Sequence, residues 1–153
     1  MDPELTTMCY IEKDGKYLML HRNKKKNDPN HDLWLGIGGH FECGETPEEC
    51  IMREVKEETG LIINDPKLKG IVTFRDGDWH EIMFLYTACD FEGELSECNE
   101  GELLWVEKDK VRNLLVSSFI DHNTMVFKVY FMYLDLRTQN KAALFHHYTG
   151  NNY

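Results

Sequence analysis

Three carboxylates in one short segment have the spacing of a metal site. Residues 53–58 read Arg-Glu-Val-Lys-Glu-Glu, which puts acidic side chains at Glu54, Glu57 and Glu58. At about 100° per residue, an α-helix places these three side chains within an arc of about 100°. Like charges this close on a helix repel each other, and a hard cation reverses that cost because Mg2+ prefers carboxylate oxygens together with substrate phosphates. The segment therefore predicts a divalent-cation site, with a solvated acidic helix face as the alternative.

The flanking residues predict the helix that this spacing requires. Thr46 is a suitable N-cap, Pro47 suits the first helical position, and Glu49 lies three residues after the cap, which makes a capping box. Gly60 can end the helix in a left-handed turn. We therefore expect a helix over residues 47–59. Three apolar side chains on the neighbouring arc are expected to face the core: Ile51, Met52 and Val55.

The stretch from Gly39 to Leu61 also agrees with a known pattern at every fixed position. It reads Gly-His-Phe-Glu-Cys-Gly-Glu-Thr-Pro-Glu-Glu-Cys-Ile-Met-Arg-Glu-Val-Lys-Glu-Glu-Thr-Gly-Leu. The pattern is G-x5-E-x7-R-E-U-x-E-E-x-G-U, where U is a bulky aliphatic residue, and the chain therefore resembles the Nudix hydrolase family. The resemblance implies the α/β Nudix fold, a mixed β-sheet sandwiched between α-helices. It also implies an enzyme that uses Mg2+, or Mn2+ as a substitute, to hydrolyse a nucleoside diphosphate joined to a further group.

The same resemblance implies roles for individual residues of this box, residues 39–61. The backbone carbonyl of Gly39 is expected to join the carboxylates as a metal ligand. Arg53 is expected to pair with a box carboxylate and orient it, and Glu45 to belong to the same supporting network. The carboxylates expected to bind metal and take part in catalysis are Glu54, Glu57 and Glu58.

One further acidic residue outside the box is expected to complete the metal site or to help activate water. Residues 99–106, Asn-Glu-Gly-Glu-Leu-Leu-Trp-Val, supply two candidates just before a short predicted strand. Glu100 is the first choice and Glu102 the reserve. The alternative for either residue is a solvated acidic loop.

The segment before the box points to a class of substrate by resemblance. Residues 34–40, Trp-Leu-Gly-Ile-Gly-Gly-His, are similar to the W-x-G-x-G-G-K of MutT-type bacterial 8-oxo-dGTP diphosphatases, and residues 18–22 fit the strand that precedes their substrate loop. These enzymes release a nucleoside monophosphate and pyrophosphate, and so remove damaged nucleotides ahead of DNA synthesis. Leu35 and His40 depart from the pattern, because some relatives have Asn and Lys there, so purine recognition must come from elsewhere.

Residues outside the box are candidates for holding the base and the triphosphate. A stacked aromatic side chain contributes on the order of 1–3 kcal/mol to base binding, and cations pair with phosphates. Each candidate has an ordinary alternative: a core or rim aromatic, a helix cap for Asp121, or solvated lysines in a loop. The base-binding candidates are Trp34, Phe74, Phe119 and Asp121, the phosphate-binding candidates are Arg22, Lys24, Lys25 and Lys26, and Gly38 would let the backbone approach the ligand closely.

Other functions remain open. Nudix hydrolases of ADP-ribose often have a proline about 16 residues after the box, and those of dinucleoside polyphosphates a tyrosine nearby; this chain has Gly77 and Trp79 at these places. Some Nudix domains only sense nucleotides, but these usually lose box glutamates, which are intact here. A third alternative is an acidic protein-interaction module without metal, which a Mg2+ titration would distinguish.

Composition sets the remaining limits. A chain of 153 residues fits one domain, residues 1–153, with residues 1–5 expected to be a tag remnant or disordered. The net charge of −10 disfavours a nucleic-acid polymer as partner. No apolar run reaches the ~20 residues that span a bilayer, and no signal peptide is evident. Five cysteines, never spaced C-x-x-C, suggest reduced thiols in a cytoplasmic protein. Monomer and homodimer both remain open.

Periodicity and turn residues predict further elements around the box. A hairpin is expected at Asp14-Gly15, because Asp-Gly between two apolar runs is a strong hairpin signal. Residues 23–33 are expected to form a loop, and residues 34–41 an extended glycine-rich segment. The remaining predicted strands are 6–12, 16–22, 67–74, 79–91, 103–106 and 143–148, and the remaining predicted helices are 108–115 and 120–136.

Overall fold

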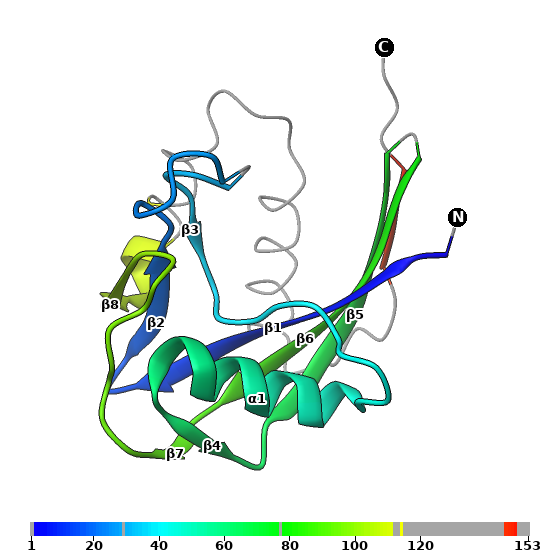
Figure 1. The fold of residues 1–153 in the computed structure, drawn as a ribbon. Helices are drawn as coiled ribbons and strands as arrows, with labels where there is room; N and C mark the ends of the chain where they lie inside the picture. Colours follow the sequence, from blue (N-terminus) through cyan, green and yellow to red (C-terminus); the bar gives the residue numbers. More distant parts are fainter. Residues whose placement is uncertain (1, 29, 77, 112–113, 115–145, 150–153) are drawn as a thin grey trace.

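A mixed β-sheet with one helix on its face positions the candidate residues. The computed structural model describes residues 2–28, 30–76, 78–111, 114 and 146–149 (Figure 1). In this part of the chain the strand order is β3-β2-β1-β6-β5-β9, with β8 pairing with β2 from off this path, and β4 and β7 form a separate small sheet. The elements are β1 (Glu4–Lys13), β2 (Lys16–His21), β3 (Trp34–Leu35), α1 (Pro47–Thr59), β4 (Ile62–Asn64), β5 (Lys67–Asp76), β6 (Trp79–Ala88), β7 (Asp90–Glu92), β8 (Glu102–Glu107) and β9 (His146–Thr149).

The predicted hairpin at Asp14-Gly15 is confirmed. Asp14 and Gly15 have φ values of 49° and 76°, the positive angles of the two-residue turn that matches the twist of a hairpin. β1 begins two residues before the predicted Thr6, because Glu4 and Leu5 pair with β6. These two residues therefore belong to the sheet and not to a disordered tail.

Side-chain alternation gives the sheet two different apolar faces. One face packs under α1, which lies across β1 and β6 (Figure 1). Its buried cluster includes Cys9, Ile11, Leu18, Leu20, Ile51, Val55, Tyr86 and Ala88. The buried cluster of the opposite face consists of Tyr10, Tyr17, Met19, Val72, Met83, Leu85 and Val111.

Helix α1 has the termini that its sequence predicts. The Thr46 hydroxyl accepts a hydrogen bond from the Glu49 amide at 3.2 Å, and the Glu49 carboxylate accepts one from the Thr46 amide at 2.8 Å. Gly60 closes the helix at φ 76°, with its amide bonded to the Lys56 carbonyl. Ile51 and Val55 are fully buried, as expected. Met52 was expected to face the core but is 40% exposed, because its position on the helix lies at the edge of the buried stripe.

Several predicted elements differ from the observed ones. The predicted strand 79–91 is divided: β6 ends at Ala88, and β7 turns away to pair with β4, a strand that was not predicted. The extended segment 34–41 contains only the two residues of β3 and single bridges from Ile37 and His40 to β1. Residues 108–111 are helical, and β9 covers the end of the predicted last strand. The predicted helix 120–136 lies outside the described residues.

The described part of the chain was also searched for membrane-crossing helices. No helix there combines the length and the apolar composition that a bilayer crossing requires.

Candidate active site

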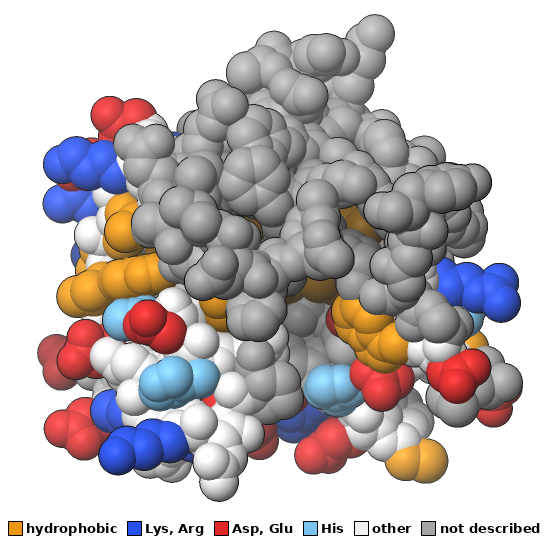
Figure 2. Space-filling view, turned by 90° about the horizontal axis from the view of Figure 1, so that it is seen from above, with side chains coloured by type: hydrophobic (Ala, Val, Ile, Leu, Met, Phe, Trp, Pro, Cys, Tyr) orange, Lys and Arg blue, Asp and Glu red, His pale blue; other side chains and the backbone are white. Residues whose placement is uncertain are grey.

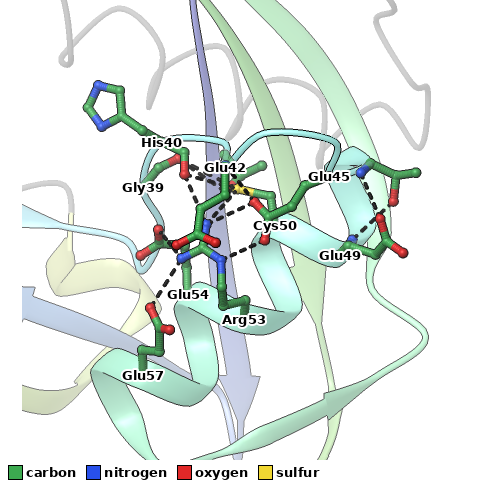
Figure 3. A network of polar contacts seen from close by, with 11 residues as sticks. Gly39, His40, Glu42, Glu45, Glu49, Cys50, Arg53, Glu54 and Glu57 are labelled. Carbon is green, nitrogen blue, oxygen red and sulfur yellow. Dashed lines mark hydrogen bonds and ion pairs between the residues drawn. The ribbon is translucent and has the colours of Figure 1, made fainter.

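Arg53 lies at the centre of the polar network on α1. Its Nε and one Nη donate to the two carboxylate oxygens of Glu45, at 2.6 and 2.9 Å. The other Nη donates to Glu54 at 2.7 Å and to Glu57 at 3.1 Å, and a further bond reaches the His40 carbonyl at 3.0 Å (Figure 3). One guanidinium therefore fixes two of the three helix carboxylates and ties the preceding loop to α1.

Electrostatics favour the ionised forms of Glu45 and Arg53. The hydrogen bonds from Arg53, aided by the Glu42 amide, lower the pKa of Glu45 to about 2. The hydrogen bond with Glu45, followed by those with Glu54 and Glu57, raises the pKa of Arg53 above its ordinary value. The fork geometry of arginine makes the bidentate pair with Glu45 possible. Glu45 and Arg53 thus occupy the supporting positions expected from the sequence.

Two glycines bring the backbone close to this network. A Cβ on Gly39 would lie 2.6 Å from the Glu54 carboxylate, so the missing side chain leaves room for that carboxylate. A Cβ on Gly38 would lie 2.1 Å from the Thr7 carbonyl oxygen, so the extended segment can approach β1 only without a side chain there. The Gly39 carbonyl, an expected metal ligand, accepts a hydrogen bond from the Thr7 amide at 2.8 Å and is directed at β1.

Glu58 is the buried member of the carboxylate set. Its Oε2 atom is buried and has no hydrogen-bond partner among the described residues. Burial raises the pKa of Glu58 to about 8, and the charges of Glu100 and Glu54 act in the same direction. The Gly38 amide and Arg22 oppose the shift. Buried polar atoms are nearly always hydrogen-bonded, so this free oxygen marks a place where a cation or a water-derived group would be bound.

The structure distinguishes between the two carboxylates outside the box. Glu100 lies near Glu58 and is held by Arg22 at 2.6 Å and by Lys25 at 3.0 Å. Glu102 is exposed in β8, where it pairs with His21. The first choice from the sequence is therefore the residue that lies beside the box helix.

Three of the four expected phosphate-binding cations, Arg22, Lys24 and Lys25, have partners within the protein, and the fourth, Lys26, is exposed. Arg22 donates to Asp28 at 2.6 Å as well as to Glu100. Burial lowers the pKa of Arg22, but the bond to Asp28 and the charge of Glu100 outweigh it and raise the pKa overall. Lys24 donates to the Cys98 carbonyl at 2.7 Å. These contacts fasten the loop after β2 to the segment that carries Glu100.

Of the base-binding candidates, Trp34 lies on the face of the sheet opposite α1. Trp34 is half-buried and packs against the cluster opposite α1, where its ring stacks on His21 with centroids 4.4 Å apart and planes at 2°. His21 is hydrogen-bonded to Asp32 at 2.7 Å. Phe74 is a residue of β5 and pairs with Glu81 of β6. Phe119 and Asp121 lie outside the described residues.

The donor set fits a hard divalent cation. Carboxylate oxygens are the ligands such an ion prefers, and Glu58 supplies one that no protein group uses. In the described part of the chain, no three acidic, His or Cys side chains already converge on one point. The reason is visible in the ion pairs: Arg53 draws Glu54 and Glu57 to itself, and Arg22 and Lys25 hold Glu100. Ion binding therefore requires these carboxylates to turn away from their arginine and lysine partners.

Sequence reasoning missed three supporting residues. Asp28 accepts a hydrogen bond from Arg22, and the His21 ring stacks on Trp34. The Cys50 thiol lies 3.5 Å from the His40 carbonyl and 3.4 Å from the Thr7 hydroxyl. Cys50 occupies an unconstrained position of the box, so the pattern carried no signal for it. The alternation of β2 could have indicated that His21 and Arg22 face opposite sides of the sheet.

Comparison with known proteins agrees with the motif and the fold. A model of the NUDIX domain matches residues 3–125. A protein named ADP-ribose pyrophosphatase, from Methanocaldococcus jannaschii, is 39% identical over 104 residues, 67% of this chain and 60% of that protein. A protein named oxidized purine nucleoside triphosphate hydrolase, from Danio rerio, is 30% identical over 110 residues, 71% of this chain and 69% of that protein.

A solved structure extends this agreement to most of the chain. The crystal structure of the mutator MutT protein from Bacillus halodurans is similar at a TM-score of 0.70 and 28% identity, and covers 95% of this chain and 90% of that chain. The mixed sheet with α1 on one face is thus the Nudix fold. Because the domain model spans most of the sequence and the box is complete, the chain belongs to the Nudix hydrolases, enzymes that act on nucleotides and generally use divalent metal ions.

Proposed function

We propose that this enzyme hydrolyses oxidised purine nucleoside triphosphates with Mg2+, and that 8-oxo-dGTP is converted to 8-oxo-dGMP and pyrophosphate. Removal of damaged nucleotides from the pool used for DNA synthesis follows from that activity. The similarity to the Danio rerio oxidized purine nucleoside triphosphate hydrolase supports the substrate class.

One observation supports the chemistry most strongly. Glu58 has a buried carboxylate oxygen without a partner, and it lies beside Glu54 and Glu100 at the point where Gly38 and Gly39 keep the backbone bare. A buried carboxylate oxygen without a partner, close to two further carboxylates, is costly for a folded protein. A function that neutralises the set explains why the chain keeps it.

The proposed mechanism divides the work among these residues. Phosphoanhydride hydrolysis depends mainly on positioning and on offsetting phosphate charge. Glu54, Glu57, Glu58 and Glu100 would hold Mg2+, with Mn2+ as a substitute. When bound, the cation acidifies a coordinated water and offsets charge on the phosphate oxygens.

Supporting residues complete this division. Glu58, which a bound cation would keep ionised, would accept a proton from the water that attacks phosphorus, while the P–O bond to the pyrophosphate leaving group breaks. Arg53 keeps Glu54 and Glu57 oriented, as supporting groups around metal sites commonly do.

Replacement of single carboxylates tests the proposed metal site. We expect Glu57→Gln and Glu58→Gln each to abolish most turnover of 8-oxo-dGTP while circular dichroism and the melting temperature show an intact fold. Glu48→Gln is the matched control, because Glu48 lies on the same helix but is bonded to Tyr86 at 3.0 Å, away from the carboxylate set. Turnover close to wild type in both test variants would refute the assignment.

A second candidate substrate is ADP-ribose. The relative from Methanocaldococcus jannaschii that is named ADP-ribose pyrophosphatase is 39% identical, more than the Danio rerio protein. The values of kcat/KM for 8-oxo-dGTP, dGTP, ADP-ribose and a dinucleoside tetraphosphate separate the candidates. We expect 8-oxo-dGTP to have the highest value, and a clear preference for either of the last two substrates would replace our proposal.

A further inference from the structure

A carboxylate on the face of the sheet away from α1 has no role in the site described above. Glu81 of β6 lies two residues before Met83 and therefore points to the same face as Met83 and Leu85, which belong to the cluster opposite α1. Seen from above, the side away from α1, charged side chains of the described residues are visible around the atoms drawn in grey (Figure 2). Glu81 differs from a solvated rim residue in being half-buried.

The contacts of Glu81 fix its carboxylate without neutralising it. The hydroxyl of Thr6, which is only 6% exposed, donates a hydrogen bond to Oε1. Burial raises the pKa of Glu81, the nearby charge of Glu4 acts in the same direction, and Thr6 and His40 oppose the shift. No Lys, Arg or His of the described residues lies within ion-pair distance of the Glu81 carboxylate. Carboxylates that are buried in proteins are usually paired with a cation.

Glu81 lies on β6, which is separated from residues 39 and 40 of the box by one strand, β1. Residues 39 and 40 run beside β1, where the Thr7 amide bonds to Gly39 and Thr6 forms a bridge with His40. β1 in turn pairs with β6, so two strand spacings of about 4.8 Å separate the box from β6. The His40 ring points away from the Arg53 network (Figure 3), and Phe74, a base-binding candidate, pairs with Glu81 on its other side. Along the sheet, a nucleotide can span this distance if its phosphates lie at residues 39 and 40 and its base lies on the face away from α1.

We propose that Glu81 is a specificity-determining residue that binds the Watson–Crick edge of a guanine-type base, with Thr6 as its positioning residue. An ionised carboxylate is an acceptor only. Guanine and 8-oxoguanine present two adjacent donors, N1–H and the 2-amino group, whereas adenine presents an acceptor and a donor. The inference rests on the proposed function for the identity of the substrate class, and it makes guanine the preferred base.

Binding of nucleoside monophosphates tests this inference without hydrolysis. By titration calorimetry, wild type is expected to bind dGMP at least about tenfold more tightly than dIMP, which lacks only the 2-amino group, because a hydrogen bond to a charged group is strong. In Glu81→Gln the carboxamide places a donor against the base, and the ratio of the two Kd values is expected to fall to about one. Thr6→Val is expected to reduce the ratio in part, and Glu81→Asp to retain some of it.

Matched controls separate base recognition from general charge. Glu4→Gln removes the neighbouring carboxylate, which is half exposed and beside His40, and is expected to leave the ratio unchanged. Asp121→Asn tests the other residue that the sequence suggests for the base edge. The inference is overturned if wild type binds dIMP or dAMP as well as dGMP, if Glu81→Gln keeps the wild-type ratio, or if only Asp121→Asn abolishes it.

The two proposals fail in different ways. A preference for ADP-ribose in the kinetic panel removes the proposed function but leaves the dGMP-to-dIMP ratio as an independent result. Hydrolysis of 8-oxo-dGTP with an unchanged ratio in Glu81→Gln removes the role of Glu81 and leaves the function. If Glu81→Gln does not fold, Glu81→Asp and Thr6→Val test the role of Glu81 in its place, and a wild-type ratio in both of these variants would overturn the inference.

Discussion

Glu58 lies buried beside two other carboxylates and keeps one oxygen without a hydrogen bond. Arg53 supports its neighbours Glu54 and Glu57 but not Glu58 itself. Glutamates on the same helix therefore differ in their ion-pair partners and in their burial. Glu57 is an exposed ion-pair partner with an ordinary solvent environment, whereas burial gives Glu58 a strongly raised pKa.

The raised pKa of Glu58 predicts how stability depends on pH in the metal-free protein. Between the ordinary value of 4.5 and about 8, the folded state keeps a proton that the unfolded chain has lost. Raising the pH through this window therefore favours unfolding, and the free energy of unfolding is expected to fall. Urea denaturation with a chelator present should show this fall in wild type and a flatter profile in Glu58→Gln. Equal slopes in the two proteins would contradict the prediction.

At the scale of elements, the extended segment before α1 contains two adjacent glycines with different neighbours. The backbone of β1 faces Gly38, and the mobile end of the Glu54 side chain faces Gly39. Backbone cannot move aside, whereas a side chain can turn. The same substitution at the two positions should therefore separate folding from function.

Gly38→Ala and Gly39→Ala form a matched pair. In Gly38→Ala the new Cβ meets the Thr7 carbonyl, and we expect a loss of about 3 kcal/mol in the free energy of unfolding. In Gly39→Ala the new Cβ displaces Glu54, and we expect a nearly unchanged melting temperature with turnover reduced about 10- to 100-fold. Chemical denaturation and kinetics on the two variants measure both effects. A strongly destabilised Gly39→Ala with normal kcat per folded molecule would contradict this.

At the scale of the molecule, the site joins parts of the chain that are far apart in sequence. Arg22 and Lys25, from the loop after β2, hold Glu100 beside Glu58 of α1. A cation bound by Glu58 and Glu100 would join α1 to the loop after β2 and to the segment that carries Glu100. It would also relieve the repulsion between the carboxylates. Binding should therefore stabilise the whole fold and not only the helix.

A thermal titration with Mg2+ measures that coupling. At a concentration about 100 times Kd, binding adds about 2.7 kcal/mol to stability, and each kcal/mol shifts Tm by about 2–4 °C in a chain of this size. We expect such a rise in wild type and in Glu48→Gln, and little or none in the Glu54→Gln/Glu58→Gln double variant. An equal rise in the double variant would place the ion elsewhere.

The sequence alone determined the features that depend on local chemistry. Thr46, Pro47, Glu49 and Gly60 predicted both ends of α1, because caps act on backbone groups within a turn of the helix. Asp14-Gly15 predicted its hairpin for the same reason. The pattern of the box, residues 39–61, also predicted the Nudix family, and the match to the NUDIX domain model confirms that prediction.

Only the tertiary structure decided which distant residues meet. The choice between Glu100 and Glu102 depended on how the loop after β2 docks, since Arg22 and Lys25 hold Glu100 while β8 directs Glu102 to solvent. The division of the predicted strand 79–91 depended on β4 pairing with β7. The burial of Glu58 and Glu81 likewise comes from packing by other elements, and burial, which a residue's own sequence neighbours do not set, is what raises the pKa of both carboxylates.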